Sequence, residues 1–413
     1  MSLSSPRAKP HPESLWIGGL LTALIALGQL STAIYVPSMP SLVTDLGTTP
    51  QRVTLTLTIF LIGFAVSQLV FGPLSDRYGR RAVLMGGLGL FLCANFACAF
   101  APSIEALLFG RFLQSVGACS GAVLGRAIVR DIYGRDRAAK ALAYIGVAFS
   151  VSPAISPIIG GYLQEWYGWQ ANFFFLAAVT LLVWAAAWLL LEETNRQPDP
   201  TALNPYDMVR NYALLLRSPV FVRHMLALSL VFSGLMAFIA ATPFLIIDTL
   251  GVRPAHYGLL SALAVFGTLA GNLSAGIFTM RLGIERMMWI GIGIAVASGG
   301  AMTALALAGF FGVLVIVIPV ILFLCGMGIV MPNGMAGAMG PFPRMAGAAS
   351  ALLGFVQMAV GAAAAALGGW LPHESLVPLA CLMLVLGLGA AIAFAAFRRP
   401  EVGDGPGVLP KTS

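Results

Sequence analysis

Charged side chains are scarce in this sequence of 413 residues. Asp, Glu, Lys and Arg together make up only 9% of it, whereas 59% of the residues are hydrophobic. An ordinary soluble domain carries about 25% charged residues, so the composition indicates an integral membrane protein. The net charge of +7 could suggest a nucleic-acid partner. The basic residues, however, occur in blocks between apolar runs, which is typical of membrane-protein loops and not of a nucleic-acid interface.

Residues that build metal sites and nucleophilic centres are also few. The four histidines lie in the tails or at the ends of apolar runs, and all five cysteines lie inside such runs. This spacing predicts no metal cluster, no disulfide framework and no pair of nucleophile and base. A phosphate-binding Gly-x-x-x-x-Gly-Lys loop is missing as well, which argues against ATP hydrolysis. We therefore predict that the chain is not an enzyme and needs no cofactor or metal.

Long apolar runs, in contrast, are abundant. Only helices can satisfy their backbone groups over about 20 residues of hydrocarbon, so the predicted fold is an all-α membrane protein with twelve transmembrane helices. The first run is too long for a typical signal-peptide core and is predicted to be retained. The twelve runs lie near residues 15–35, 53–71, 82–100, 104–125, 141–163, 171–191, 224–247, 258–278, 287–308, 312–336, 346–370 and 376–397.

The basic residues predict the orientation of these spans. If the N-terminus lies in the cytoplasm, 20 of the 23 Lys and Arg residues fall on the cytoplasmic side. Arg52 and Arg253 remain outside, and Arg111 lies within a span. Cytoplasmic loops carry such an excess of Lys and Arg. The prediction is therefore a multi-pass protein of the bacterial inner membrane with both termini in the cytoplasm.

One long polar segment separates six runs from six others. It predicts a cytoplasmic linker at 192–223, within which 207–217 could form an interfacial helix. The remaining predicted parts are a tail at 1–14, a six-helix bundle at 15–191, a second bundle at 224–397 and a tail at 398–413. Adding 204 to the residue numbers places Gly72, Arg77 and Gly79 on Gly276, Arg281 and Gly283, which indicates that the two halves arose by duplication.

The stretch between the second and third runs reads Gly-Pro-Leu-Ser-Asp-Arg-Tyr-Gly-Arg-Arg and predicts a tight polar hairpin. It resembles the loop motif of the major facilitator superfamily. That resemblance implies two pseudo-symmetric six-helix bundles, with a substrate site between them near mid-membrane. It also implies a latch that holds one conformation; the alternative is a charged turn that only sets topology. The latch residues would be Gly72, Asp76, Arg77, Gly79, Arg80 and Arg81.

Two further motifs lie in the fourth and fifth runs. Arg111 and Gln114 belong to an Arg-x-x-Gln-x-x-Gly pattern, which resembles the motif of proton-coupled members and implies a role in proton exchange. A structural arginine that reaches toward the membrane surface is the alternative. The fifth run resembles the antiporter signature, in which prolines kink the helix and glycines allow close packing; a generic kinked helix is the alternative. The residues of that signature are Pro153, Pro157, Gly160 and Gly161.

The end of the first run, Thr-Ala-Ile-Tyr-Val-Pro, resembles the bicyclomycin and chloramphenicol resistance branch of drug:proton antiporters, as do segments in runs two, four, seven and eleven. That branch has an aspartate where this sequence has Ala33, two residues before Tyr35. Without a buried carboxylate, neutral or zwitterionic substrates are expected. Proton coupling would then use Asp45, Glu105 or Asp248 near the outer ends of spans, or Asp76.

These observations predict a monomeric multidrug exporter of small, mainly apolar compounds, which exchanges them for protons and draws on the proton gradient. A uniporter for a specific metabolite is the first alternative, and a membrane sensor or scaffold that does not transport is the second. We expect the cavity to be mostly apolar with a few orienting polar groups. Its expected lining is Gln29, Ala33, Tyr35, Phe238, Asn333 and Gln357.

Overall fold

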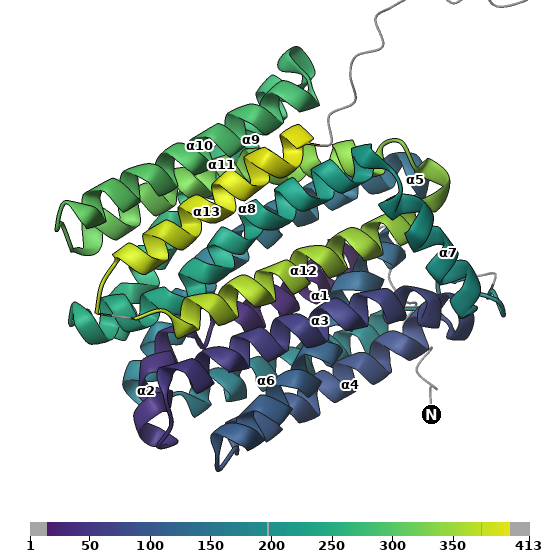
Figure 1. Ribbon diagram of the computed structural model, residues 1–413. Coiled ribbons are helices and arrows are strands. Elements are labelled where there is room, and N and C mark those ends of the chain that lie inside the picture. Colours follow the sequence, from purple (N-terminus) through teal and green to yellow (C-terminus); the bar gives the residue numbers. More distant parts are fainter. Residues whose placement is uncertain (1–14, 196–197, 373, 397–413) are drawn as a thin grey trace, which may run out of the picture.

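The computed structural model describes residues 15–195, 198–372 and 374–396, without the side chains of residues 15, 134–151 and 344. Every regular element in this part is helical, and most of the helices run side by side along one direction (Figure 1). The long helices are α1 (Leu15–Ala33), α3 (Pro50–Tyr78), α4 (Arg80–Ala99), α5 (Ile104–Tyr167), α6 (Gln170–Leu190), α8 (Pro219–Pro243), α9 (Pro254–Leu282), α10 (Ile284–Leu307), α11 (Val313–Met339), α12 (Ala346–Trp370) and α13 (Val377–Ala396). The short ones are η1 (Val36–Ser38), α2 (Met39–Asp45), α7 (Pro205–Leu216), η2 (Phe244–Thr249) and η3 (Pro343–Met345).

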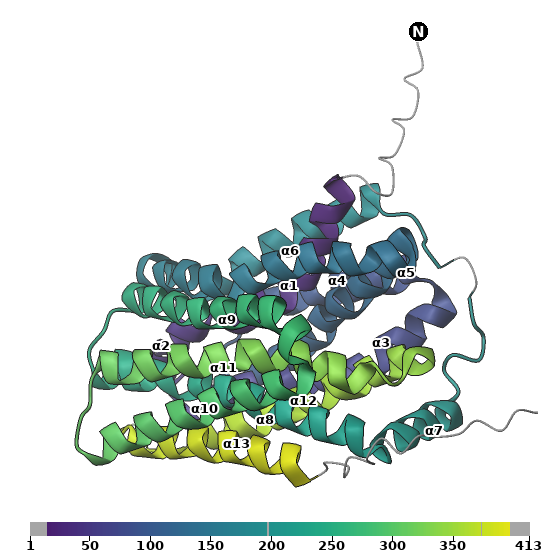
Figure 2. The same ribbon diagram turned by 90° about the horizontal axis from the view of Figure 1, so that it is seen from above.

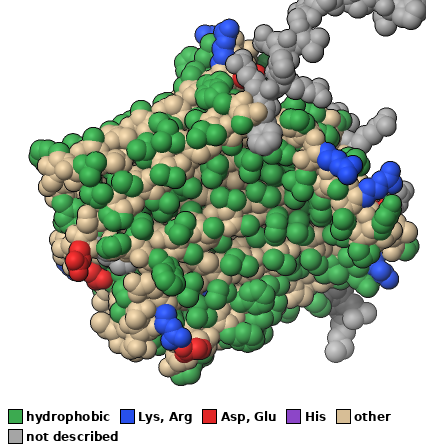
Figure 3. Space-filling model, in the orientation of Figure 1, with side chains coloured by type: hydrophobic (Ala, Val, Ile, Leu, Met, Phe, Trp, Pro, Cys, Tyr) green, Lys and Arg blue, Asp and Glu red, His purple; other side chains and the backbone are tan. Residues whose placement is uncertain are grey.

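The surface and the helix lengths fit a bilayer. Eleven helices in the described part are long and apolar enough to cross a membrane. The remaining predicted span, 141–163, lies in α5, and the side chains of its first part, 141–151, are outside the description. Hydrophobic side chains cover the face seen in Figure 3, and charged side chains lie along its margins. The prediction of an all-α membrane protein is confirmed.

Helix α5 is not one straight rod, because two distant parts of it pack along the same neighbour, α1. Gly121 packs against the backbone of Leu24, and Gly160 packs against the backbone of Ile34. The two contact points on α1 are about 15 Å apart, whereas 39 residues of straight helix would cover about 58 Å. Both parts of α5 therefore lie along α1, as two separate spans would.

Helix packing follows the order of the chain. Within residues 15–190, α5 packs against α1, α3 and α4, and α4 packs against α6; within 219–396, α8 packs against α11, α12 and α13, and α10 against α11 and α13. The first group runs from purple to teal-blue in Figures 1 and 2, and the second runs from teal (α8) through green to yellow. The main contacts between the groups are α5 with α9 and α3 with α12. The predicted division into two bundles stays a prediction.

The polar segment between these groups contains a helix, α7, where the sequence allowed an interfacial one. Helix α8 then begins at Pro219, before the predicted boundary at 224. The Ser218 side chain accepts a hydrogen bond from the backbone N–H of Phe221, and proline is favoured in a first turn. The predicted tails at 1–14 and 398–413 lie outside the described residues.

Two glycines support the duplication. Gly79 and Gly283 each end one helix and begin the next, with φ of 93° and 82° and ψ of 148° and 158°. Backbone with positive φ favours glycine because it has no Cβ. The two residues are 204 positions apart, as the comparison of the halves requires.

Candidate transport site

The polar hairpin is tighter than the sequence suggested. Helix α3 continues to Tyr78 and α4 starts at Arg80, so Gly79 alone makes the reversal. A Cβ on Gly79 would lie 2.6 Å from a carboxylate oxygen of Glu193, whereas a Cβ on Gly72 would meet no atom within 4 Å. Close approach therefore explains Gly79 but not Gly72 in this conformation. We call the end of the bundle that carries this hairpin the motif end.

Glu193 lies just beyond α6 and caps α4. Its two carboxylate oxygens accept hydrogen bonds from the backbone N–H groups of Arg80, at 2.9 Å, and Arg81, at 3.0 Å. An anion is favoured at a helix N-terminus because it satisfies unpaired N–H groups and meets the positive end of the helix dipole. This contact joins the end of α6 to the hairpin.

The ionic contacts of the hairpin residues stay within the first group of helices. Arg80 pairs with Asp76 at 2.6 Å and with Asp131 of α5 at 3.2 Å. The side chain of Arg81 donates to the carbonyl of Trp188 at 2.9 Å and lies over its ring. No described residue of α8 to α13 takes part in these pairs. Whether the motif latches a conformation stays a prediction.

The segment that follows α6 also forms hydrogen bonds with the hairpin. The Asn195 side chain donates to the carbonyl of Asp76 at 2.8 Å, and the backbone N–H of Asp199 donates to the same oxygen at 3.0 Å. Hydrogen bonds from the hydroxyl and backbone N–H of Thr201 hold the pKa of Asp199 below its ordinary value. The start of the segment between α6 and α7 is thus ordered by the motif.

Arg111 lies at the centre of a buried polar cluster. It is 0% exposed, with its guanidinium 4.2 Å from the ring of Tyr35 and 4.4 Å from that of Phe60. It donates to Gln114 and, at 3.3 Å, to the carbonyl of Ser31. Two aromatic faces and two oxygens therefore surround the cation, which is how a desolvated guanidinium can be held within a span.

The cluster continues as an oriented chain of amides. Gln114 donates to Asn95 at 2.6 Å, and Asn95 donates to the carbonyl of Phe91 at 2.8 Å. The Gln114 oxygen thus accepts from Arg111, and the Asn95 oxygen accepts from the Gln114 amide nitrogen. Among the described residues no carboxylate pairs with Arg111, and its Nε and one terminal nitrogen lack an acceptor. Dipoles, not an acid, compensate this charge.

The antiporter signature of the fifth run lies where α5 packs against the end of α1 and the start of α9. A Cβ on Gly160 would collide with the carbonyl of Ile34, and one on Gly161 would lie 2.5 Å from that of Pro254. Across the same contact, a Cβ on Gly258 would lie 2.3 Å from the carbonyl of Pro157. Helices α5 and α9 therefore touch backbone to backbone, as small residues permit. The helix continues through Pro153 and Pro157; the kink at these prolines stays a prediction.

Beside this contact, an ion pair joins the two groups of helices at the end remote from the motif, which we call the opposite end. Arg253 pairs with Glu165 of α5 at 2.7 Å, and the backbone N–H of Ala255, in the first turn of α9, donates to the other oxygen of Glu165 at 3.2 Å. Glu165 is thus both an ion-pair partner and a cap of α9. Together with the glycine contacts, it holds α5 against the start of α9 at the opposite end.

The three acids proposed for proton coupling also lie at the opposite end. Asp45 is exposed, and Glu105 pairs with Arg52 at 2.9 Å with both side chains more than half exposed. Asp248 lines a cavity of about 270 Å³ between the two groups, together with Gln164 and Pro254. Among the described contacts, none of the three acids reaches Arg111. Their role in coupling stays a prediction.

The residues expected to line the cavity have different surroundings. Gln29 and Ala33 are half-buried on one face of α1, whereas Tyr35 is 0% exposed and shares a 3.2 Å hydrogen bond with Thr56. Asn333 accepts from Thr279 at 2.9 Å, so it joins α11 to α9. Phe238 and Gln357 are buried. In this conformation only Gln29 and Ala33 among the six have substantial exposed area; their role in binding stays a prediction.

The model of the Major Facilitator Superfamily matches residues 21–366. The chain belongs to this superfamily. The match spans α1 to α12, so it includes the hairpin, the Arg111 cluster and the contact of α5 with α9. Members are transporters, and the prediction that the chain is not an enzyme is thereby confirmed.

Curated members of the superfamily are similar over most of their length. A bicyclomycin resistance protein homolog of Haemophilus influenzae is 29% identical over 381 residues, which cover 92% of this chain and 94% of the relative. Multidrug resistance protein D of Escherichia coli is 29% identical over 369 residues, covering 89% and 92%. A chloramphenicol resistance protein of Pseudomonas aeruginosa is 30% identical over 339 residues, covering 81% and 78%. The predicted resemblance to this branch is confirmed.

Solved structures of the superfamily agree in fold. A D-xylose–proton symporter superposes with a TM-score of 0.73 at 16% identity, covering 92% of this chain and 97% of the symporter. Nucleoside transporter NupG gives 0.70 at 15% identity, covering 93% and 99%. At such low identity the likeness concerns the fold alone.

The sequence pointed to the motifs but missed their partners. Glu193, Glu165 and Arg253 received no role because each is a single charged residue near a helix end. Glu193 follows Leu191-Glu192 directly after a span, and an acid there gives no signal of which helix it caps. Glu165 and Arg253 are 88 residues apart, so only the packing of α5 on α9 brings them together.

Proposed function

We propose that this protein exports small, mainly apolar, neutral or zwitterionic compounds across the bacterial inner membrane, as a monomer and in exchange for protons. The observation that carries the proposal is the likeness, over 78 to 94% of their length, to proteins named for bicyclomycin, chloramphenicol and multidrug resistance. The buried cluster around Arg111 supports the substrate class. It offers no carboxylate to a cation, so a positively charged drug would find no fixed counter-charge there.

The contact of α5 with α9 supports a cycle of alternating access. The two groups of helices meet at the opposite end through glycines and the pair of Glu165 with Arg253. In the proposed orientation both termini and the motif end face the cytoplasm, so the conformation described is closed toward the outside. Rocking of one group against the other would break that pair and expose the site on the other side.

A uniporter for a specific metabolite is the second candidate, and the same cluster favours it. Arg111 donates to Gln114, which Asn95 orients in turn, and to a backbone carbonyl. None of these groups exchanges a proton at physiological pH. A proton-coupled cycle would therefore need Asp45, Glu105, Asp248 or Asp76. A uniporter would need none of these acids. Neither a proton antiporter nor a uniporter would need a cofactor.

Inside-out membrane vesicles separate the two candidates. For a proton antiporter, an imposed proton gradient drives uptake of a neutral fluorescent substrate into the vesicles, and a protonophore abolishes it. Uptake that reaches the same level with and without the gradient would identify a uniporter. Ala33→Asp adds an acid on the half-buried face of α1 and should extend transport to lipophilic cations. Arg111→Gln should abolish gradient-driven uptake if Arg111 tunes proton exchange.

A further inference from the structure

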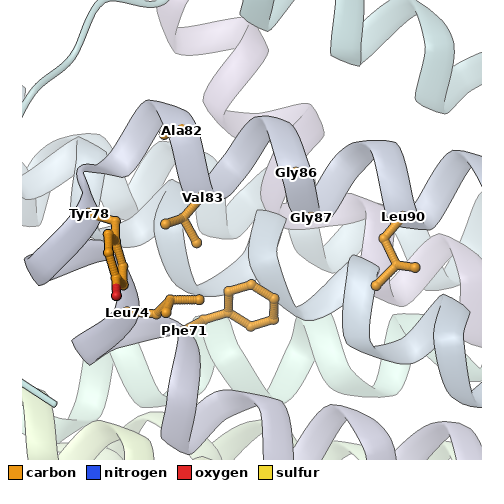
Figure 4. A pocket seen from close by; sticks show the side chains of 8 residues that line it. All are labelled: Phe71, Leu74, Tyr78, Ala82, Val83, Gly86, Gly87 and Leu90. Carbon is orange, nitrogen blue, oxygen red and sulfur yellow. The ribbon is translucent and has the colours of Figure 1, made fainter.

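A groove of about 400 Å³ runs between α3 and α4 at the motif end. Its walls are Phe71, Leu74 and Tyr78 from α3 and Ala82, Val83, Gly86, Gly87 and Leu90 from α4. Figure 4 shows the side chains of Phe71, Leu74, Val83 and Leu90 directed into the space between the helices, with Tyr78 at one end and Leu90 toward the other. The stretch from Ala82 to Leu90 is about 12 Å long. The lining is apolar except for the tyrosine hydroxyl.

This groove opens on the membrane-facing surface. Tyr78 is 59% exposed, and Val66 and Val70 on the same helix are half exposed. Tyrosines are enriched where the hydrocarbon core meets the headgroup region, and Tyr78 is the last residue of α3. The groove therefore extends from the level of the headgroups into the hydrocarbon region.

One of the lining residues is a glycine, Gly86, that packing between helices does not require. A Cβ on Gly87 would lie 2.2 Å from Ser120, so Gly87 is needed for α4 to pack on α5. A Cβ on the adjacent Gly86 would meet no atom within 4 Å. Glycine is about 1 kcal/mol worse than alanine in a helix interior. The hollow left at Gly86 is therefore a feature that packing between the helices does not explain.

An exposed cation, Arg77, lies at the headgroup end of the groove. Arg77 is exposed, and its guanidinium lies 5.3 Å from the ring of Tyr78, which lines the groove. The neighbouring acid, Asp76, pairs with Arg80, and Glu193 is engaged by the first turn of α4. Within the described residues, no carboxylate forms an ion pair with Arg77.

We propose that this groove binds an anionic phospholipid, with an acyl chain along α3 and α4 and the phosphate at Arg77 and the Tyr78 hydroxyl. An acyl chain gains little by leaving other acyl chains for an apolar groove, because lipid tails are as apolar as the lining. Selection among lipids must therefore come from the headgroup. A basic residue at the membrane surface attracts anionic lipids.

The second half of the chain provides a matched control. At an offset of 204, Arg281 corresponds to Arg77, and Ile290 corresponds to Gly86. Arg281 and Ile290 are both exposed. A side chain thus occupies the place that Gly86 leaves hollow, while the basic residue at the helix end is kept. A substitution of Arg281 therefore shows the effect of removing a basic residue at a helix end that has no such groove beside it.

Native mass spectrometry of the full-length protein tests the proposal. The protein is purified in detergent micelles that contain equal amounts of phosphatidylglycerol and phosphatidylcholine with identical chains. The wild type should retain phosphatidylglycerol about five-fold over phosphatidylcholine, the preference that one arginine gives. Arg77→Gln should bring this ratio to about one, and Arg281→Gln should leave it unchanged. Gly86→Leu adds a side chain where a Cβ meets no atom within 4 Å, and it should reduce retention of both lipids.

Other results would overturn the proposal. Equal retention of the two lipids by the wild type would remove the headgroup selection. An equal effect of Arg281→Gln would show bulk electrostatic attraction, and full retention by Gly86→Leu would show that the groove is not used. Inorganic phosphate, which has the charge but no chain, should fail to displace the lipid; displacement would identify a phosphate site instead.

Discussion

The ion pair between Glu165 and Arg253 should set the balance between the two conformations of the transporter. It is the described ion pair that joins α5 to the start of α9 at the opposite end, and it can exist only while that end is closed. Glu165→Gln should therefore shift the population toward a conformation in which the opposite end is open. An interaction made in one state alone changes the equilibrium by its full free energy.

The structure gives the size of this shift. Arg253 is 70% exposed and Glu165 13%, so the pair contributes about 0.5 kcal/mol, as exposed ion pairs do. Glu165 also accepts from the N–H of Ala255. Gln keeps that bond but loses its charge assistance and its interaction with the helix dipole, about 1 kcal/mol. Glu165→Gln should thus shift the equilibrium about ten-fold, and Arg253→Gln, which spares the cap, only about two-fold.

Spin-label distances measure this shift directly. One label replaces Phe100, in the turn between α4 and α5, and the other replaces Phe310, in the turn between α10 and α11. Both side chains are exposed at the opposite end, in different groups of helices. In a background without the native cysteines, double electron–electron resonance should show a longer distance whose population grows from wild type to Arg253→Gln to Glu165→Gln.

A second ion pair at the same end serves as the control. Arg52 and Glu105 pair at 2.9 Å, but they join α3 to α5 within one group of helices. That pair persists when the groups move apart as rigid bodies, so Glu105→Gln should leave the distance distribution unchanged. The reasoning is refuted if Glu105→Gln shifts the populations as much as Glu165→Gln, or if Glu165→Gln shifts them no more than Arg253→Gln.

Two further substitutions test other contacts. Glu193→Gln removes the charge that caps α4 and should destabilise the protein by about 2 kcal/mol, seen as a lower apparent melting temperature in detergent; Glu374→Gln, an exposed acid without a described partner, should have no effect. Gly258→Val should prevent close contact with Pro157 and lower both the yield of folded protein and transport. Gly276→Val, where a Cβ meets no atom within 4 Å, should be tolerated.

Much of the architecture was predictable because hydrocarbon imposes a local rule. A span must be long, apolar and helical, so hydropathy alone predicted the ends of α4, α6, α12 and α13 within two residues. The hairpin was also predictable as a stretch, Gly72 to Arg81, but only the structure shows that Gly79 alone makes the reversal. Boundaries that depend on caps were less accurate. Helix α3 runs on to Tyr78 through Pro73, and α8 begins early at its Ser218 cap.

The partners of the polar residues were not predictable, because each depends on packing between helices far apart in the sequence. Nothing local to Arg111 indicates that Tyr35 and Phe60 enclose it, or that Asn95 holds the Gln114 amide with its oxygen toward Arg111. The sequence showed only that no acid lies at the centre of a span. The tertiary structure adds that dipoles and aromatic rings take the place of an acid.

By itself, the sequence determined that this chain spans the membrane many times and carries a superfamily motif. Both properties depend only on residues that are consecutive in the chain. Only the tertiary structure decided what the glycines and charges do. Adjacent Gly86 and Gly87 are equivalent in sequence, yet one is required for packing on Ser120 and the other leaves a groove open. The reason is geometric, since successive residues of a helix point about 100° apart and meet different neighbours.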